Sequence, residues 1–203
     1  HTCDGYQFQS RDQDDFSIEV KLTSDQNQST RWLVGGYYAE IERDVAVSYG
    51  ADLGKGFELK PYVPATGKNP TDLAFDDTFT TDVFSIFGQY SIDLSDVTEL
   101  SIEARYDNEK RSVDNNVPAT TSALYYGGGA PINPAMTAGG SKIPSRDKSY
   151  NQFQPKISIT RSVENTTFYA TYGVGFRSGG FNSSGSAALI NSQLNIPVGA
   201  GLS

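Results

Sequence analysis

The chain has 203 residues and carries 24 acidic against 16 basic side chains, a formal net charge of −8 at pH 7. This balance argues against nucleic acid as a partner, because no basic stripe is available to displace the counterions of a phosphate backbone. One cysteine, Cys3, and one histidine, His1, exclude a disulfide within the chain and a zinc cluster of Cys and His ligands.

The first predicted hairpin follows a polar start. We expect a solvated loop over residues 1–15, because Asp12, Asp14 and Asp15 lack the oxygen spacing and the glycine of a calcium loop. Residues 16–23 (FSIEVKLT) alternate with period two and predict a strand with two unlike faces. After a polar turn, a returning strand is predicted with an apolar parity of Leu33, Gly35, Tyr37, Ala39 and Ile41, and with Trp32 as an interfacial anchor.

Two further hairpins are predicted, each preceded by a long irregular segment. The first such segment covers about residues 50–80 and leads to alternating residues on both sides of the turn 93–98. The second covers about residues 113–149 and leads to 153–160 (FQPKISIT), a turn at 161–165 and a strand from Thr166. Pro155 cannot donate to a ladder, so we expect it at a strand end or a bulge.

The last strand has the clearest pattern. Over about ten residues its apolar set alternates with a second set that ends at Arg177: Phe168, Ala170, Tyr172, Val174 and Phe176 against Tyr169, Thr171, Gly173, Gly175 and Arg177. About ten residues is what a tilted strand needs to cross the hydrocarbon of a bilayer. Long strands with short turns at one end and long loops at the other are typical of an outer-membrane barrel.

Catalytic chemistry is poorly represented. A Ser/His/Asp set is excluded because the one histidine is His1. Glu103, Arg105 and Asp107 share one strand face, and we interpret them as a charge network facing the lumen rather than as an acid or base. The glycines at 127–129 are not followed by the Lys and Ser/Thr of a phosphate-binding loop, so a loop tip is the better interpretation.

The string 166–182, TTFYATYGVGFRSGGFN, resembles the Y-x-x-G-F-(K/R)-S-G-G-F-N signature of TonB-dependent outer-membrane receptors. Four other segments resemble that family: FSIEVKLTS, WLVGGYYAE, the hairpin DVFSIFGQYSIDL with LSIEARYDNEKR, and FQPKISIT. Ala104 departs from the family pattern, which has glycine there, and neither a plug domain nor a TonB box lies in these residues.

The resemblance implies an all-β fold: six or seven antiparallel strands of a larger barrel of about 22 strands. It implies that residues 1–203 are an internal, partial barrel domain in a bacterial outer membrane. It also implies uptake of a scarce nutrient, foremost a ferric siderophore, with neither a cofactor nor an enzymatic reaction. The partners implied are outer-membrane lipid, the protein's own plug domain and the TonB complex, which acts through an N-terminal part outside these residues. A soluble β-sandwich that binds carbohydrate or mediates adhesion is the alternative.

These interpretations assign faces and candidate sites. Ligand contacts are expected from the long loops, with Tyr62, Tyr125 and Tyr126 as aromatic candidates. Polar side chains expected to face the lumen are Glu19, Lys21, Gln89, Glu103, Arg105, Asp107, Lys156, Thr171 and Arg177. Side chains expected to face lipid are Phe16, Ile18, Val20, Leu22, Ile86, Tyr90, Ile102, Ile157, Ile159, Phe168 and Tyr172.

Overall fold

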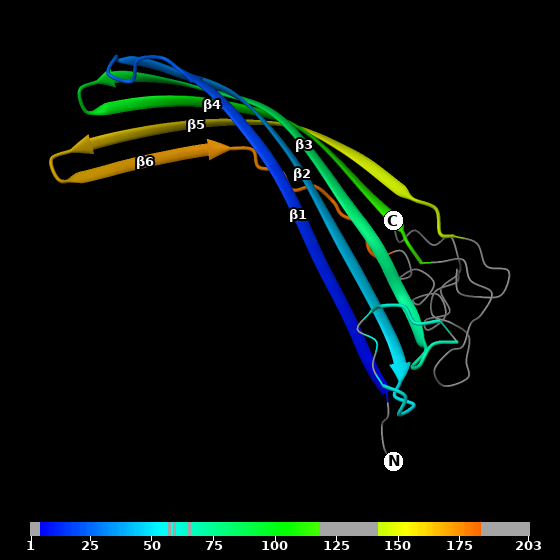
Figure 1. Cartoon of the computed structure of the whole chain (residues 1–203). Helices are drawn as coiled ribbons and strands as arrows, with labels where there is room; N and C mark the ends of the chain where they lie inside the picture. The colour runs from blue at the N-terminus through cyan, green and yellow to red at the C-terminus, as the bar shows by residue number, and fades with distance from the viewer. Residues whose placement is uncertain (1–4, 57, 59, 65, 118–141, 184–203) are drawn as a thin grey trace, which may run out of the picture.

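The computed structural model describes residues 5–183 except 57, 59, 65 and 118–141. These residues form one antiparallel sheet whose strands stand in sequence order: β1 (Gly5–Thr23), β2 (Thr30–Ala51), β3 (Thr71–Ser95), β4 (Thr98–Asn115), β5 (Arg146–Val163) and β6 (Thr166–Gly173). The sheet curves strongly, like part of a barrel wall (Figure 1). The predicted fold class, an antiparallel β-barrel segment, is confirmed.

The connections differ in length at the two ends of the sheet. At one end they are residues 24–29, 96–97 and 164–165, and at the other they are residues 52–70 and 116–145. The turn 164–165 holds Glu164 at a φ of 53°, in the left-handed region. The predicted layout of short turns opposite long loops is therefore confirmed.

The first five strands are longer than the sequence pattern predicts. β1 begins at Gly5, so the loop predicted over residues 1–15 is wrong, and the first long loop covers 52–70 rather than 50–80. β1 pairs with β2 along its whole length, from Gly5 opposite Ala51 to Thr23 opposite Leu33. Hydrogen bonds between strands join backbone groups and do not depend on apolar side chains. The polar residues 5–15 can therefore pair with β2 as well as the apolar part of β1 does.

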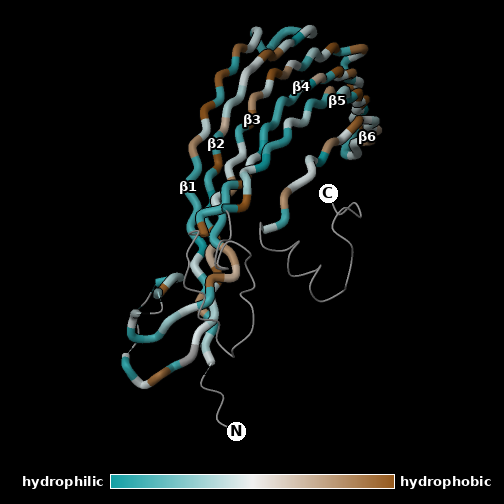
Figure 2. Tube along the Cα trace, turned by 90° about the vertical axis from the view of Figure 1, so that its right-hand side faces the viewer, coloured by the Kyte–Doolittle hydropathy of each residue, from teal (hydrophilic) through white to brown (hydrophobic). Residues whose placement is uncertain are grey.

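One face of the sheet, called the apolar face, carries large exposed hydrophobic side chains. Every residue predicted to face lipid lies there, with exposed fractions from 43% for Ile159 to 75% for Tyr172. The part of the apolar face that carries these side chains is called the apolar band. On β3 it runs from Phe84 to Ile92, a length close to the nine to eleven or so residues of a membrane-crossing strand. Figure 2 shows the alternation of brown and teal residues along the strands.

The parity predicted for β2 is wrong. Val34 lies opposite Leu22, and Trp32 lies opposite Tyr90, so these two residues belong to the apolar face. The residues predicted as the apolar set, such as Leu33 and Ala39, lie on the other face, where Ala39 is 3% exposed. A one-residue shift in register moves every side chain to the opposite face, and pairing with β1 decides which face that is.

β6 ends at Gly173 rather than at Arg177. Among the described residues, the last backbone hydrogen bond on this side of β5 runs from Val174 N to Pro155 O, at 3.0 Å. Pro155 lies within β5, not at a strand end or a bulge as expected. Its missing N–H is on the β6 side, because a residue's N–H and carbonyl point to the same antiparallel neighbour. The ladder between β5 and β6 stops at this rung.

Candidate functional site

The face opposite the apolar face, called the polar face, is the concave one. Residues 174–183 pass under the arch of the sheet in Figure 1 and contact side chains of this face. Side chains crowd together on a concave surface, and Ser85, Ser91 and Ser101 here are at most 6% exposed. The candidate site is this polar face together with the end of the sheet that carries the long loops.

The Phe87 ring lies at the centre of the polar face and crosses over Gly35. A Cβ on Gly35 would lie 2.5 Å from Phe87 Cζ, so only glycine admits the ring in this position. Two cations flank the ring: Lys21 Nζ lies 5.9 Å and Arg105 Cζ 5.7 Å from its centroid. Both distances are within cation–π range, so Phe87 orders two charged side chains above the sheet.

Arg105 and Asp107 together link three strands, β3, β4 and β5. Its guanidinium donates to Asp107 Oδ1 at 2.7 Å and to Ser85 Oγ at 2.8 Å. Asp107 also accepts from Gln154 Nε2 through its other oxygen. Both carboxylate oxygens of Asp107 therefore accept hydrogen bonds from side chains of the sheet itself.

The remaining charges predicted on β1, β4 and β5 form pairs. Lys156 Nζ lies 3.0 Å from Glu103 Oε1, and Lys21 Nζ lies 2.5 Å from Glu19 Oε1. The structure thus brings together five of the six charged residues nominated from the sequence: Glu19, Lys21, Glu103, Arg105 and Asp107. That this face lines a closed lumen stays a prediction.

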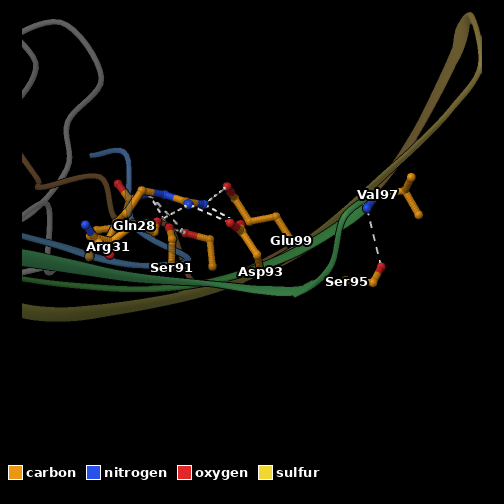
Figure 3. Close-up of polar contacts among 9 residues, drawn as sticks. Gln28, Arg31, Ser91, Asp93, Ser95, Val97 and Glu99 are labelled. Carbon is orange, nitrogen blue, oxygen red and sulfur yellow. Dashed lines mark hydrogen bonds and ion pairs between the residues drawn. The ribbon is translucent and has the colours of Figure 1, made fainter. Parts of the chain in front are cut away.

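A second charged group lies near the short turns and was not singled out from the sequence. Arg31 is bound by Asp93 at 2.6 Å and Glu99 at 2.5 Å, and it donates to the Gln28 carbonyl at 2.7 Å (Figure 3). A hollow of about 460 Å³ lies beside it, lined by Ser29, Asp93, Ser95, Asp96, Val97, Thr98, Glu99, Thr160 and Ser162. Arg31, Asp93 and Glu99 come from β2, β3 and β4, so no local sequence pattern signals the cluster.

At the opposite end, residues 52–70 are held by Asn69, which is 1% exposed. Its Oδ1 accepts from Leu53 N at 2.9 Å, and its Nδ2 donates to Gly56 O at 2.9 Å. Tyr6 of β1 donates to the Asn69 carbonyl at 3.3 Å. Burial, followed by the nearby charges of Asp52 and Glu58, raises the Tyr6 pKa and keeps this hydroxyl a donor.

A small hydrophobic core joins this loop to the sheet. Leu73 and Val117 are buried against each other, and Tyr62 packs on them with its side chain half-buried. Tyr62 therefore presents one edge to the surface of the loop-bearing end. The other two aromatic candidates, Tyr125 and Tyr126, lie outside the described residues.

Acidic side chains crowd the part of the sheet beyond the apolar band. Burial raises the pKa of Asp76, and the charges of Asp77 and Asp44 raise it further. Asp77 is fully buried and accepts from Asn115 Nδ2 at 3.1 Å. The described residues contain no group of three or more His, Cys, Asp or Glu side chains arranged to hold a metal ion.

Residues 174–183, called the strap, leave β6 and cross the polar face over β4 and β5. Ser178 Oγ donates to Glu109 Oε1 at 2.9 Å, and the Phe176 and Tyr150 rings lie 6.4 Å apart. Further on, Arg146 lies 5.6 Å from the Phe181 ring centroid. Arg177, between two seated residues, is exposed, and no hydrogen bond or ion pair joins it to another described residue.

Within the described residues, no helix has the length and apolar character needed to cross a membrane. Neither the curated proteins nor the solved structures that were searched contain a match to this chain. The model of one protein family, described as "TonB dependent receptor-like, beta-barrel", matches residues 4–200. This match covers nearly the whole chain and agrees with the meander, the apolar face and the loop layout, so the chain belongs to the TonB-dependent receptor-like β-barrel family.

Proposed function

We propose that this chain is part of the wall of an outer-membrane receptor that imports a scarce nutrient, with a ferric siderophore as its cargo. Its barrel has about 22 strands, filled by a plug domain and energised by the TonB complex. The apolar face contacts outer-membrane lipid, and the polar face contacts the plug and the passing ligand. Family membership supports the receptor class. The cargo is the more specific part of the proposal.

The single observation that carries the membrane part is the uncovered apolar face. Its side chains come from all six strands, and many are about half exposed or more, such as Phe16 at 60% and Phe153 at 57%. Soluble proteins rarely leave so extended an apolar patch open to water. In hydrocarbon the same face is favourable, while the paired backbone groups of the inner strands are satisfied within the sheet. No feature of the described residues favours the soluble sandwich.

Ligand contacts are proposed at the loop-bearing end and on the strap. Tyr62 has an ordered base on Leu73 and Val117, and aromatic rings held in this way contribute contact area at low entropic cost. Arg177 adds an exposed cation on the concave side, with no ion pair to another described residue. An exposed guanidinium donates charge-assisted hydrogen bonds to anionic oxygens, so it suits those siderophores that carry such groups. Tyr125 and Tyr126 are proposed as further contacts on the second long loop.

The test is uptake of radiolabelled iron by cells that carry the full-length receptor as their only one. We expect uptake of at least one ferric siderophore from a panel of hydroxamate, catecholate and carboxylate types, and loss of this uptake in cells without TonB. Uptake of cobalamin, haem or a glycan instead would refute the iron cargo and retain the receptor. Recovery of the protein in the soluble fraction after cell fractionation would refute the proposal that it is a membrane receptor.

Two substitutions refine the test. Tyr62→Phe keeps the packing on Leu73 and removes only the hydroxyl, and Arg177→Gln removes the free charge. We expect weaker ligand binding from each, with unchanged receptor levels in the membrane. Arg161→Gln on the apolar-face side of β5 is the matched control for loss of one arginine charge, and normal binding is expected from it.

A further inference from the structure

The strap follows β6 and lies next to an edge of β5 with which it does not pair. In the structure it crosses the polar face, yet it leaves β6 while still in register with β5. The established pairs run from Val163 opposite Thr166 to Lys156 opposite Gly173, and Val174 N still donates to Pro155 O. Beyond this rung, β5 from Arg146 to Gln154 has no strand partner on that side among the described residues.

Continuing the register matches the strap to that free edge. In the pairing of β5 with β6, the two residue numbers of each pair have the same sum. Extending this register places Val174 opposite Pro155, Phe176 opposite Phe153, and Ser178 opposite Asn151. Val174 and Phe176 then join the apolar face, where Phe153 is 57% exposed. Apolar character on both strands ends at the same level, because Ser178 and Asn151 are both polar. The residues that would then lie on the polar face are Gly175, Arg177 and Gly179.

The seated position uses different contacts of the same residues. Phe176 lies near Tyr150, which is a polar-face residue, so its ring is on the concave side of the sheet. Ser178 is bound to Glu109. A Cβ on Gly179 would lie 2.6 Å from Tyr150 Oη, so a side chain at 179 must displace the Tyr150 ring or the strap itself. At Gly175, by contrast, no atom lies within 4 Å of an added Cβ.

We propose that residues 174–183 alternate between these two positions: seated across the polar face, or paired with the free edge of β5 as a continuation of β6. Gly173 forms the hinge, since it has no side chain to be moved and directly precedes the last rung, at Val174. In the seated position Ser178 to Phe181 cover Glu109, Arg111 and Tyr150. In the paired position these three side chains open to the concave space, and Phe176 crosses from that space to the apolar face.

The two positions place residue 176 in different solvents, which gives a direct readout. A nitroxide on Phe176→Cys, in a Cys3→Ser background of the full-length receptor in lipid vesicles, reports collisions with oxygen in hydrocarbon and with an aqueous nickel complex. We expect mainly aqueous exposure in the parent protein. Gly179→Val, which conflicts with the seated position, is expected to shift the label to hydrocarbon exposure.

Gly175→Val is the matched control. It makes the same chemical change on the same strand parity, but the seated position has room for it, so the label is expected to stay mainly aqueous. Ser178→Ala is a milder second variant, which removes the bond to Glu109, and it is expected to shift the label in the same direction as Gly179→Val. A label whose environment is the same in the parent, Gly179→Val and Ser178→Ala would overturn the proposal.

The inference rests on the proposed function only in placing lipid against the apolar face. A nitroxide on Phe153→Cys separates the two, because Phe153 faces that side whatever the strap does. Aqueous exposure at 153 would refute the membrane receptor. Hydrocarbon exposure at 153, with residue 176 aqueous in every variant, would refute the paired position alone.

Discussion

Asn69 is a single buried residue on which the order of residues 52–70 depends. Asn69→Ala leaves Leu53 N and Gly56 O without their partners, and an unsatisfied buried polar group costs about 1–3 kcal/mol. We expect faster hydrogen exchange throughout residues 52–70 and unchanged exchange in the membrane band. Asn27→Ala, in the exposed turn between β1 and β2, is the control. Equal effects of the two substitutions would contradict this role.

Asp76 makes stability depend on pH. Its pKa in the folded protein is raised above the unfolded value of about 3.9, so the folded state gains stability as pH falls through the folded pKa. At neutral pH the charged carboxylate is disfavoured by burial and by Asp77 and Asp44. Asp76→Asn should therefore raise the melting temperature of the receptor at pH 7.

The gain from Asp76→Asn should shrink as pH falls through the folded pKa and should be much smaller at about pH 4, where the wild-type carboxyl is increasingly protonated in both states. Asp96→Asn, in the exposed turn between β3 and β4, is the exposed control. Thermal unfolding of the detergent-solubilised receptor at pH 7 and pH 4 measures both. A gain of equal size at the two pH values would refute the role of this carboxylate.

The apolar face has a residue-scale test at Ile102, which is 50% exposed and near the middle of the band. An arginine on the lipid side near the midplane costs about 2–4 kcal/mol. Ile102→Arg should therefore lower the stability of the folded receptor by this amount. Thr171→Arg, an exposed polar-face residue one level away, should cost much less. Urea unfolding in lipid vesicles gives the comparison, and the reverse order would invalidate the facing.

Among the elements, the hairpin of β5 and β6 contains a strained residue. Glu164 has a φ of 53°, a conformation that costs about 1–2 kcal/mol for a residue with a Cβ and little for glycine. Glu164→Gly is therefore expected to stabilise the receptor by about 1 kcal/mol. Asn165→Gly, next to it without a positive φ, is expected to be neutral or destabilising. Stabilisation by both substitutions would indicate that chain flexibility, not strain, is responsible.

Most of the element order could be predicted from the sequence, because period-two alternation is strong wherever one face is apolar. The pattern fails where both faces of a strand are polar. The segment of β1 that contains Asp12, Asp14 and Asp15 is an example, because it has no alternation of apolar and polar residues. It also fails where register rather than composition decides, as at Trp32 and Val34.

The site was predictable only in part, for a related reason. Glu103, Arg105 and Asp107 share a face through simple alternation, so their grouping follows from one strand. The cluster at Arg31 joins residues from β2, β3 and β4, and Asn69 reaches Leu53 and Gly56 across a loop. Such contacts depend on pairing between strands and on loop closure, which no short pattern records. The strap has the alternation of a strand and yet is seated elsewhere.

At the scale of the whole molecule, the sheet has two open sides, at β1 and β6. Within hydrocarbon each unpaired backbone group costs several kcal/mol, so residues 1–203 on their own are expected to form an open sheet that makes no pore. Refolding these residues in detergent and comparing gel mobility before and after boiling measures closure. A compact, heat-modifiable species that conducts ions in planar bilayers would refute this expectation.

The up-and-down order of the strands has a consequence for how the protein is made. Every strand from β2 to β6 pairs with the strand synthesised just before it, so each finds its template already in place. Contacts that are local in sequence require little loop-closure entropy, and chains built from them fold faster than those with distant pairings. The strand order therefore requires no strand to wait for a partner that is distant in sequence, whichever end of the sheet pairs first.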